Sequence, residues 1–160
     1  RILPQPFILQ EERVYWCFSL TMEKNMFMIK MIVVYTTNVY ENIVLPAKLM
    51  KRKVDEKEVF RLVKDLEIQE KLFQMPDALS GGQQQRVAIA RAVYTHPTIL
   101  LGDELTGNLD SRTSASVMKL LKGICSQQTL LIVTHDENVA AMADQIICMK
   151  DGKVVENGKL

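Results

Sequence analysis

The sequence predicts an α/β fold whose core is a parallel sheet with helices packed against it. From about Asn38 onward, short apolar runs of strand length alternate with longer segments in which apolar residues recur at helical spacing. Strands separated by crossover helices imply a parallel sheet. Two of the apolar runs end in acidic or histidine side chains, and open α/β sheets bind ligands at the carboxyl ends of their strands. A ligand site is therefore expected at that edge of the sheet.

The first predicted helix begins near Asp55, because Asp55 and Glu58 have the spacing of a capping box. Arg61 and Asp65 are expected to face outward as an i, i+4 ion pair. The apolar stripe of this helix, at i, i+3, i+4 and i+7, consists of Val59, Leu62, Val63 and Leu66.

A second helix is predicted from Ser80, since Ser80 and Gln83 repeat the capping pattern. It should run to about Tyr94 and end before Pro97, because the residue preceding a proline disfavours helical geometry. A third helix should be capped by Asp110 or Ser111. Its expected buried stripe consists of Val117, Leu120, Leu121 and Ile124.

The strands are predicted from short apolar runs. Ile99–Leu101 and Leu130–Val133 are continuous, which favours strands buried on both faces of a parallel sheet. A short helix over residues 138–143 follows the second run. Ile146–Met149 is then expected to pair with Val154–Val155 through a hairpin turn at residues 151–152.

Composition excludes several functional classes. The 160 residues suit one domain, and a formal net charge of +1 gives no electrostatic footprint for nucleic acid. Cys17, Cys125 and Cys148 lack C-x-x-C spacing, so free thiols in a reducing compartment are expected. The longest apolar run near the start, residues 26–35, is shorter than the roughly 20 residues that span a bilayer. Any membrane role is therefore expected to come through a partner.

Ser80 to Gln83 form a helix start that suits phosphate binding. Gly81 and Gly82 leave backbone N–H groups uncovered, and a helix N-terminus attracts anions through free donors and the macrodipole. For Ser80-Gly81-Gly82 alone, an ordinary serine-capped helix after a glycine turn is an equal alternative.

Asp103, Glu104 and His135 follow the two apolar runs. Adjacent side chains on an extended chain point in opposite directions, so the two carboxylates can take different roles. A polar strand end and a satisfied surface histidine are the structural alternatives, and each signal by itself is weak.

Taken in order, these segments resemble the ATP-binding subunit of an ABC transporter. Residues 79–92 (LSGGQQQRVAIARA) are similar to the signature motif and its helix. Asp103-Glu104 resembles the Walker B carboxylates, residues 106–110 (TGNLD) resemble the D-loop, and His135 resembles the switch histidine. The segments VYENIVLP, at residues 39–46, and GNLD resemble the corresponding sequences of the family branch that serves lipoprotein release, macrolide efflux and antimicrobial-peptide export.

This resemblance implies a P-loop NTPase (RecA-like) parallel sheet core with an ABC-type helical subdomain, and ATP and Mg²⁺ as cofactors. Asp103 would hold the Mg²⁺, Glu104 would polarise the attacking water and His135 would contact the terminal phosphate. Asp110 would belong to the D-loop. The residues implied to contact ATP bound by a second subunit are Ser80, Gly81, Gly82 and Gln83.

Three departures from the family pattern stand out. Leu105 occupies the position where the family usually has Pro, and Gly102 replaces the more usual Ala. The first is expected to have an effect of about 1 kcal/mol without loss of function, and the second to be harmless. The third is serious, because no G-x-x-x-x-G-K-[ST] occurs in the sequence. The phosphate-cradling Walker A motif is thus absent from this polypeptide.

We accordingly divide the chain into three parts. Residues 1–37 are expected to be an unmatched N-terminal segment of the kind that a frameshift or wrong start would produce. The alternative for residues 26–35 is a strand that substitutes for the missing P-loop strand. Residues 38–96 are expected to form the helical subdomain with the signature motif. Residues 97–160 are expected to form the C-terminal part of the core with Walker B, D-loop and switch histidine.

The expected function is that of an ABC transporter subunit that couples ATP hydrolysis to export or release of a lipoprotein, peptide or hydrophobic compound. Its expected partners are a second ATPase subunit and a transmembrane permease subunit, with no nucleic acid, at the cytoplasmic inner face of the cell membrane. Without Walker A, this copy should be inactive alone. One alternative is a non-catalytic remnant or assembly-only subunit. Another is a non-transport ABC ATPase of DNA repair, chromosome structure or translation, against which the lack of heptads, paired cysteines and a second signature argues.

Overall fold

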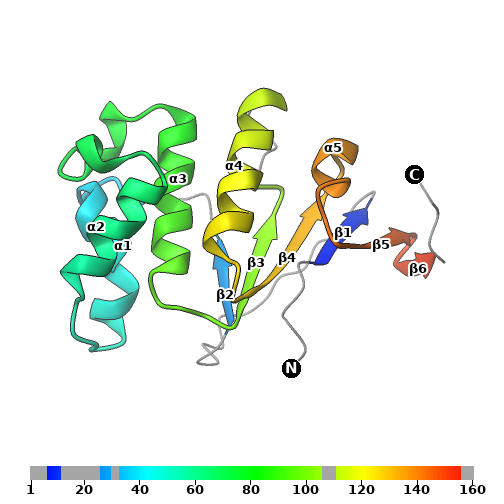
Figure 1. Cartoon of the computed structure of the whole chain (residues 1–160), viewed down its shortest axis with the longest axis horizontal. Coiled ribbons are helices and arrows are strands. Elements are labelled where there is room, and N and C mark those ends of the chain that lie inside the picture. The colour runs from blue at the N-terminus through cyan, green and yellow to red at the C-terminus, as the bar shows by residue number, and fades with distance from the viewer. Residues whose placement is uncertain (1–6, 12–25, 30–32, 106–110, 156–160) are drawn as a thin grey trace.

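The computed structural model describes residues 7–11, 26–29, 33–105 and 111–155. They form one six-stranded sheet with a helical lobe beyond one edge (Figure 1). The strands are β1 (Phe7–Glu11), β2 (Met26–Ile29), β3 (Ile99–Asp103), β4 (Thr129–Thr134), β5 (Gln145–Lys150) and β6 (Lys153–Val155). The helices are α1 (Val39–Leu49), α2 (Glu56–Asp65), α3 (Gly81–Val93), α4 (Ser111–Ile124) and α5 (Glu137–Ala140), with 3₁₀ turns η1 (Gln69–Lys71) and η2 (Pro76–Ala78).

The strands lie in the order β2-β3-β4-β1-β5-β6, and all neighbours are parallel except β5 and β6. The predicted α/β class with a parallel sheet is therefore confirmed. β1 lies between β4 and β5, with Leu9 opposite Val133 on one side and Ile147 on the other. This interior strand comes from the segment of the sequence that shows no clear period.

The hypothesis that residues 26–35 supply the interior strand is wrong in its position. Met26–Ile29 does form β2, but β2 pairs only with β3 and lies at the edge of the sheet. The interior place goes to Phe7–Glu11 instead. Strand pairing between distant segments decides this placement, and no local pattern in the sequence reports it.

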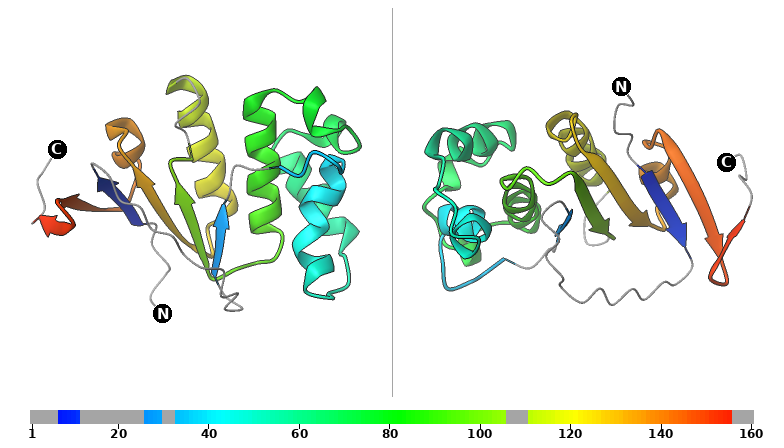
Figure 2. Two further views of the ribbon diagram at one scale, coloured as in Figure 1. Left: turned by 180° about the vertical axis from the view of Figure 1, so that it is seen from behind. Right: turned by 90° about the horizontal axis from the view of Figure 1, so that it is seen from below.

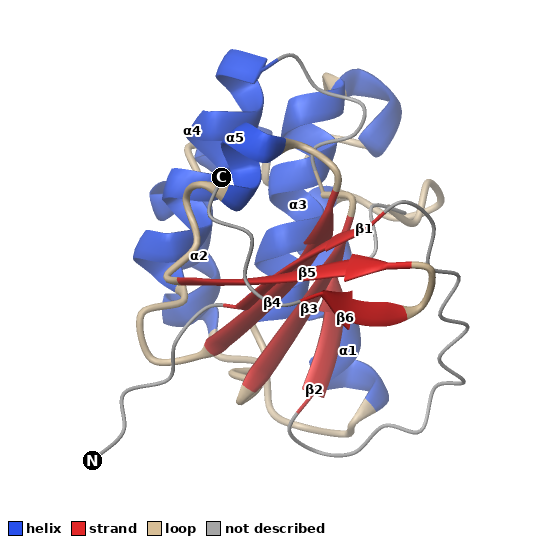
Figure 3. Ribbon diagram, turned by 90° about the vertical axis from the view of Figure 1, so that its right-hand side faces the viewer, coloured by secondary structure: helices blue, strands red, loops and turns tan. Residues whose placement is uncertain are grey.

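Helices α3, α4 and α5 lie against one face of the sheet (Figure 2, right; Figure 3). Burial therefore alternates along β3 and β4: Leu100 and Ile132 are buried, whereas Leu101 and Val133 are half-buried. The expectation of strands buried on both faces is wrong, because helices of the described chain cover only one face. Continuous apolar runs thus do not report double burial here.

The α2 helix agrees with its prediction at the stripe and differs at the cap. Val59, Leu62, Val63 and Leu66 are fully buried. Asp55 caps the helix by accepting from Lys57 N–H and Glu58 N–H, but Glu58 does not return the reciprocal bond. Its carboxylate accepts instead from the Arg61 guanidinium at 2.6 and 2.8 Å, which lowers the pKa of Glu58. Arg61 also makes the predicted contact with Asp65 at 3.3 Å.

The α1 helix is not among the elements predicted from the sequence. Asn38 caps it in a complete capping box, with Glu41 N–H donating to Asn38 Oδ1 at 2.9 Å and Asn38 N–H donating to Glu41 Oε2 at 3.3 Å. Asn42, fully buried, ties the helix to the preceding turn: its Oδ1 accepts from Val34 N–H at 2.8 Å and its Nδ2 donates to Val34 C=O at 2.9 Å.

In α4, the buried stripe is rotated from the predicted one. Val117 and Leu121 are buried as expected, whereas Leu120 and Ile124 are half-buried and Met118 takes an inward position. The candidate cap Asp110 lies outside the described residues. The short helix predicted over residues 138–143 is α5 and ends earlier, at Ala140. The hairpin is found as predicted, with positive φ at both Asp151 and Gly152.

Candidate functional site

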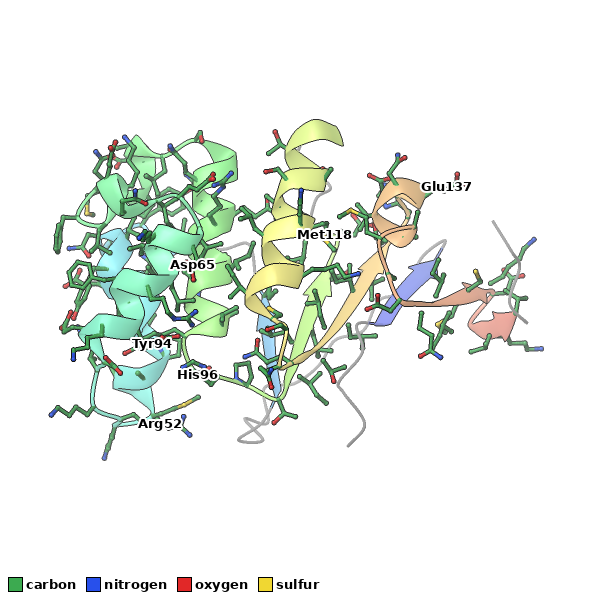
Figure 4. The ribbon with its side chains drawn as sticks, viewed as in Figure 1. Arg52, Asp65, Tyr94, His96, Met118 and Glu137 are labelled. Atoms are coloured by element: carbon green, nitrogen blue, oxygen red, sulfur yellow. The ribbon has the colours of Figure 1, made fainter. Side chains whose placement is uncertain are left out.

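The N-terminus of α3 and the carboxyl ends of β3 and β4 lie at the same edge of the sheet (Figure 1). The helix runs antiparallel to the strand that follows it, so its other end, at Tyr94 and His96, lies at the opposite edge (Figure 4). The predicted phosphate-binding turn and the predicted carboxylates thus share one edge, where open α/β sheets place their ligands.

Ser80 begins α3 in extended geometry and closes a capping box with Gln83. Ser80 N–H donates to Gln83 Oε1 at 2.9 Å, and Gln83 N–H donates to Ser80 Oγ at 3.4 Å. A Cβ built on Gly81 would meet no atom within 4 Å, and one on Gly82 would meet only Thr113 Cγ2 at 3.6 Å. Packing within the described chain therefore does not require glycine at position 81. An open helix start of this kind leaves room for an anion close to the backbone.

Asp103 is the last residue of β3, and the chain turns away from the strand at Glu104. Glu104 has φ of +43°, a conformation that costs a non-glycine residue free energy and is held only by its surroundings. Its backbone N–H donates to Val133 C=O at 2.9 Å, which ties the turn to β4. Both carboxylates are exposed.

His135 lies directly beside Glu104. The Nδ1 of His135 is 3.0 Å from Glu104 Oε1, and the two side chains are 66% and 55% exposed. Asp136 follows and caps α5 by accepting from Asn138 N–H at 2.8 Å, while Asp136 N–H donates to Thr134 Oγ1 at 3.1 Å. These bonds fix the end of β4, so the histidine is presented at the sheet edge beside the carboxylate.

The structure brings some of the predicted residues into contact and not others. Glu104 and His135 touch, and Asp103 is the neighbour of Glu104 on the chain. Asp110 lies outside the described residues. Within the described ranges no three acidic, histidine or cysteine side chains gather as a metal centre. The chain's own side chains there thus offer no all-protein metal cage.

Gln85 is a site residue that sequence reasoning left without a role. It is fully buried, and its Nε2 donates to the backbone carbonyl of Leu105, the residue after Glu104. Its Oε1 finds no partner among the described residues. The signal in the sequence is a polar residue on the same helix face as Ala88 and Ile89, which are buried, and this signal does not identify the hydrogen-bond partner.

Solved structures share this fold. In the dimeric, post-hydrolysis structure of the ATP-binding cassette MJ0796 of Methanocaldococcus jannaschii, bound to ADP and Pi, the matched part superposes with a TM-score of 0.70 and 36% identity. The match covers 81% of this chain and 60% of that one. The chain thus has the P-loop NTPase fold of ATP-hydrolysing cassettes.

Comparison with sequence relatives identifies the family within this fold. The family model described as "ABC transporter" matches residues 17–107, and so begins ahead of Asn38. The lipoprotein-releasing system ATP-binding protein LolD of Porphyromonas gingivalis is 43% identical over 116 residues, 70% of this chain. The macrolide export ATP-binding/permease protein MacB of Campylobacter jejuni is 42% identical over 122 residues, 74% of this chain. The chain belongs to the ABC transporter family.

The chain spans only part of the relatives that it matches: 53% of the LolD protein and 19% of the MacB protein. Within the ranges that the structure describes, no helix has both the length and the apolar character needed to cross a bilayer.

Proposed function

We propose that this chain acts as an ATP-binding subunit of an ABC transporter and contributes its signature turn to ATP held by a second, complete ATPase subunit. The observation that supports this is the shared sheet edge, where an open, capped helix start at Ser80 lies with the Glu104–His135 pair. Phosphoryl transfer depends mainly on positioning and charge stabilisation, so a rigid backbone turn aimed at phosphate is a useful part by itself.

The roles proposed for the single residues follow from their chemistry. Ser80, Gly81, Gly82 and Gln83 would present N–H and hydroxyl groups to the terminal phosphate of the partner-bound ATP. Three further roles would apply to ATP held on the same chain: Asp103 would hold Mg²⁺ as one exposed carboxylate beside substrate phosphates and water, Glu104 would orient the attacking water and His135 would contact the terminal phosphate. Because this chain is proposed to hold no ATP of its own, these three side chains would have no substrate in the mixed dimer. Asp110 would act in the D-loop.

Catalysis with ATP bound to this chain itself is not expected. The interior strand β1 ends at Glu11, and the sequence continues Glu12-Arg13 instead of a glycine-rich loop with lysine. Acidic groups at a strand's carboxyl end repel phosphates, whereas the backbone N–H groups of a P-loop attract them. We therefore propose that the isolated chain has no ATPase activity above that of its Glu104→Gln variant.

The wider assignment rests on the relatives. We propose residues 38–96 as the helical subdomain and residues 97–160 as the C-terminal part of the core. The matching cassette structure is dimeric, and the relative MacB is described as an ATP-binding/permease protein. By analogy, the proposed partners are a second ATPase subunit and a transmembrane permease, with the chain held peripherally at the inner face of the cell membrane. The cargo would be a lipoprotein, peptide or hydrophobic compound.

The test is complementation in a mixed dimer. A complete relative such as LolD, carrying a substitution that disables its own signature serine, forms inactive homodimers. Added wild-type chain should restore ATP turnover by about 10-fold or more, since each mixed dimer regains one whole site. In this chain Ser80→Arg should abolish the restoration, whereas Glu104→Gln should preserve it because no ATP lies beside that carboxylate. Mixed dimers that form but remain inactive would refute the proposal.

A second candidate is a non-catalytic, assembly-only subunit or remnant. The sequence after the interior strand β1, residues 12–25, contains no glycine and therefore no P-loop motif, and this favours the alternative. Co-purification with a permease, without restored turnover in the mixed dimer, would support it.

A further inference from the structure

Leu105 occupies the space that a side chain at position 102 would need. A Cβ built on Gly102 would lie 2.5 Å from Leu105 Cδ1 and 2.7 Å from Leu105 Cγ, well inside contact distance. Leu105 is only 1% exposed and belongs to the hydrophobic core, so its side chain is not free to move aside. The glycine is therefore required by this leucine.

Between these two residues the chain leaves β3 and turns. Glu104, inside the turn, has the left-handed φ of +43°. Three contacts hold the turn. The Leu105 side chain packs over Gly102, and Glu104 N–H donates a hydrogen bond to Val133 C=O at 2.9 Å. Gln85 Nε2 donates a hydrogen bond to Leu105 C=O. A residue in a strained backbone conformation persists only where surrounding contacts hold it there, and these three contacts hold Glu104.

Gln85 connects this turn to the signature helix. It lies on α3, which begins at Ser80, and it is fully buried. Its bond to Leu105 C=O is a direct link between the helix that starts at the signature and the turn that presents Glu104. A buried polar side chain that loses its partner costs free energy, so the link resists separation of the two elements.

We propose that Gly102, Leu105 and Gln85 are positioning residues that together fix the 102–105 turn and thereby the place of Glu104. Gly102 and Leu105 act as a coupled pair, in which the missing Cβ of one accommodates the side chain of the other. The two departures from the family pattern, which sequence reasoning treated as independent, are then a single compensated change. The functional meaning of the turn depends on the function proposed above, but its geometry does not.

The first test is a double-mutant cycle on the full chain, followed by thermal unfolding. Gly102→Ala should lower the melting temperature by about 5 °C or more, because the new methyl overlaps Leu105. In a Leu105→Ala background the same Gly102→Ala change should cause no further loss. Gly123→Ala is the matched control, since a Cβ there meets nothing within 4 Å. Equal losses from Gly102→Ala in both backgrounds would overturn the pairing.

A Gly102→Ala chain that does not fold is also informative. Recovery of folding on adding Leu105→Ala supports the pair, and continued failure contradicts it.

The second test reads the turn itself, by amide hydrogen exchange. Gly102→Ala and Gln85→Leu should each speed exchange at the Glu104 amide by about 10-fold. The Leu66 amide, bonded to Leu62 C=O in α2 at 2.9 Å, should keep its rate. Exchange that rises equally at both amides would mean that these residues serve only general stability and would overturn a positioning role. Neither test uses ATP, so failure here is distinct from failure of the mixed-dimer experiment.

Discussion

At the scale of single residues, Ser80 has two tasks that one substitution can separate. Its Oγ accepts from Gln83 N–H and caps α3, and by proposal it also faces a phosphate bound by the partner. Aspartate caps helices about as well as serine. Its negative charge, however, repels a phosphate that serine would contact.

Ser80→Asp is therefore expected to leave the free energy of unfolding within about 0.5 kcal/mol of wild type and to abolish restored turnover in the mixed dimer. Chemical denaturation and the turnover assay measure the two effects. Ser80→Ala is the matched variant: it loses the cap, at about 1 kcal/mol, without adding charge. If Ser80→Asp restored turnover as well as wild type, Ser80 would not face the phosphate.

The candidate site residues were predicted from short local motifs in the sequence. Ser80, Glu104 and His135 each lie inside or directly after a short distinctive segment, so the sequence places them at element ends, and the fold then gathers those ends at one edge. The contacts of Gln85 with Leu105, and of Leu105 with Gly102, were not predicted. Both depend on how the elements pack in three dimensions, and no spacing rule reports that.

At the scale of elements, a side-chain hydrogen bond joins the first turn of α1 to the first turn of α2. Tyr40 Oη donates to Glu56 Oε1 at 2.5 Å, and this bond, with burial, raises the pKa of Tyr40 to about 12 from an ordinary value of 10.0. A raised folded-state pKa means that the neutral phenol is favoured in the folded chain. Its contribution is fully present below pH 10 and is lost as pH rises toward 12.

We expect the Tyr40 phenol to titrate near pH 12 by ¹³C NMR, and Glu56→Gln to lower its pKa toward the ordinary value. Stability should decline between pH 10 and 12 in wild type, with a smaller decline in Tyr40→Phe, which has no phenol to titrate. A Tyr40 pKa that is the same in Glu56→Gln as in wild type would show that the bond does not form in solution.

Elements with a clear local pattern in the sequence were predicted, whereas β1, which has none, was missed. The stripe of α2 recurs every three or four residues and is visible within one short window, and all four of its members are buried. β1 has no such local signal, because a strand is defined by its pairing with segments more than 100 residues away, as Leu9 with Val133 shows. α1 was missed although Asn38 and Glu41 have capping-box spacing.

At the scale of the whole molecule, the sheet depends on β1. This strand joins β4 to β5 and, through β5, to the β6 hairpin, so its removal would divide the sheet in two (Figure 2). Each residue of β1 from Phe7 to Gln10 is paired on both sides. An interior strand needs its backbone N–H groups for the ladder, and proline has none.

Leu9→Pro is accordingly expected to destabilise the chain by about 3 kcal/mol or more, enough to broaden or abolish a cooperative thermal transition. Leu9→Val, which keeps the backbone donor, is the control and should melt cooperatively. Circular dichroism on heating measures both. A Leu9→Pro chain that melts like wild type would show that β1 is not an interior strand.

As a whole molecule, this chain is proposed to complete a partner's ATP site while holding no ATP of its own. Native mass spectrometry counts the ATP molecules bound to the mixed dimer directly. The partner is a complete relative whose catalytic glutamate is changed to glutamine, so that bound ATP is retained. We predict one ATP per mixed dimer, and two per homodimer of the relative. Two ATP molecules in the mixed dimer, or none, would contradict the claim.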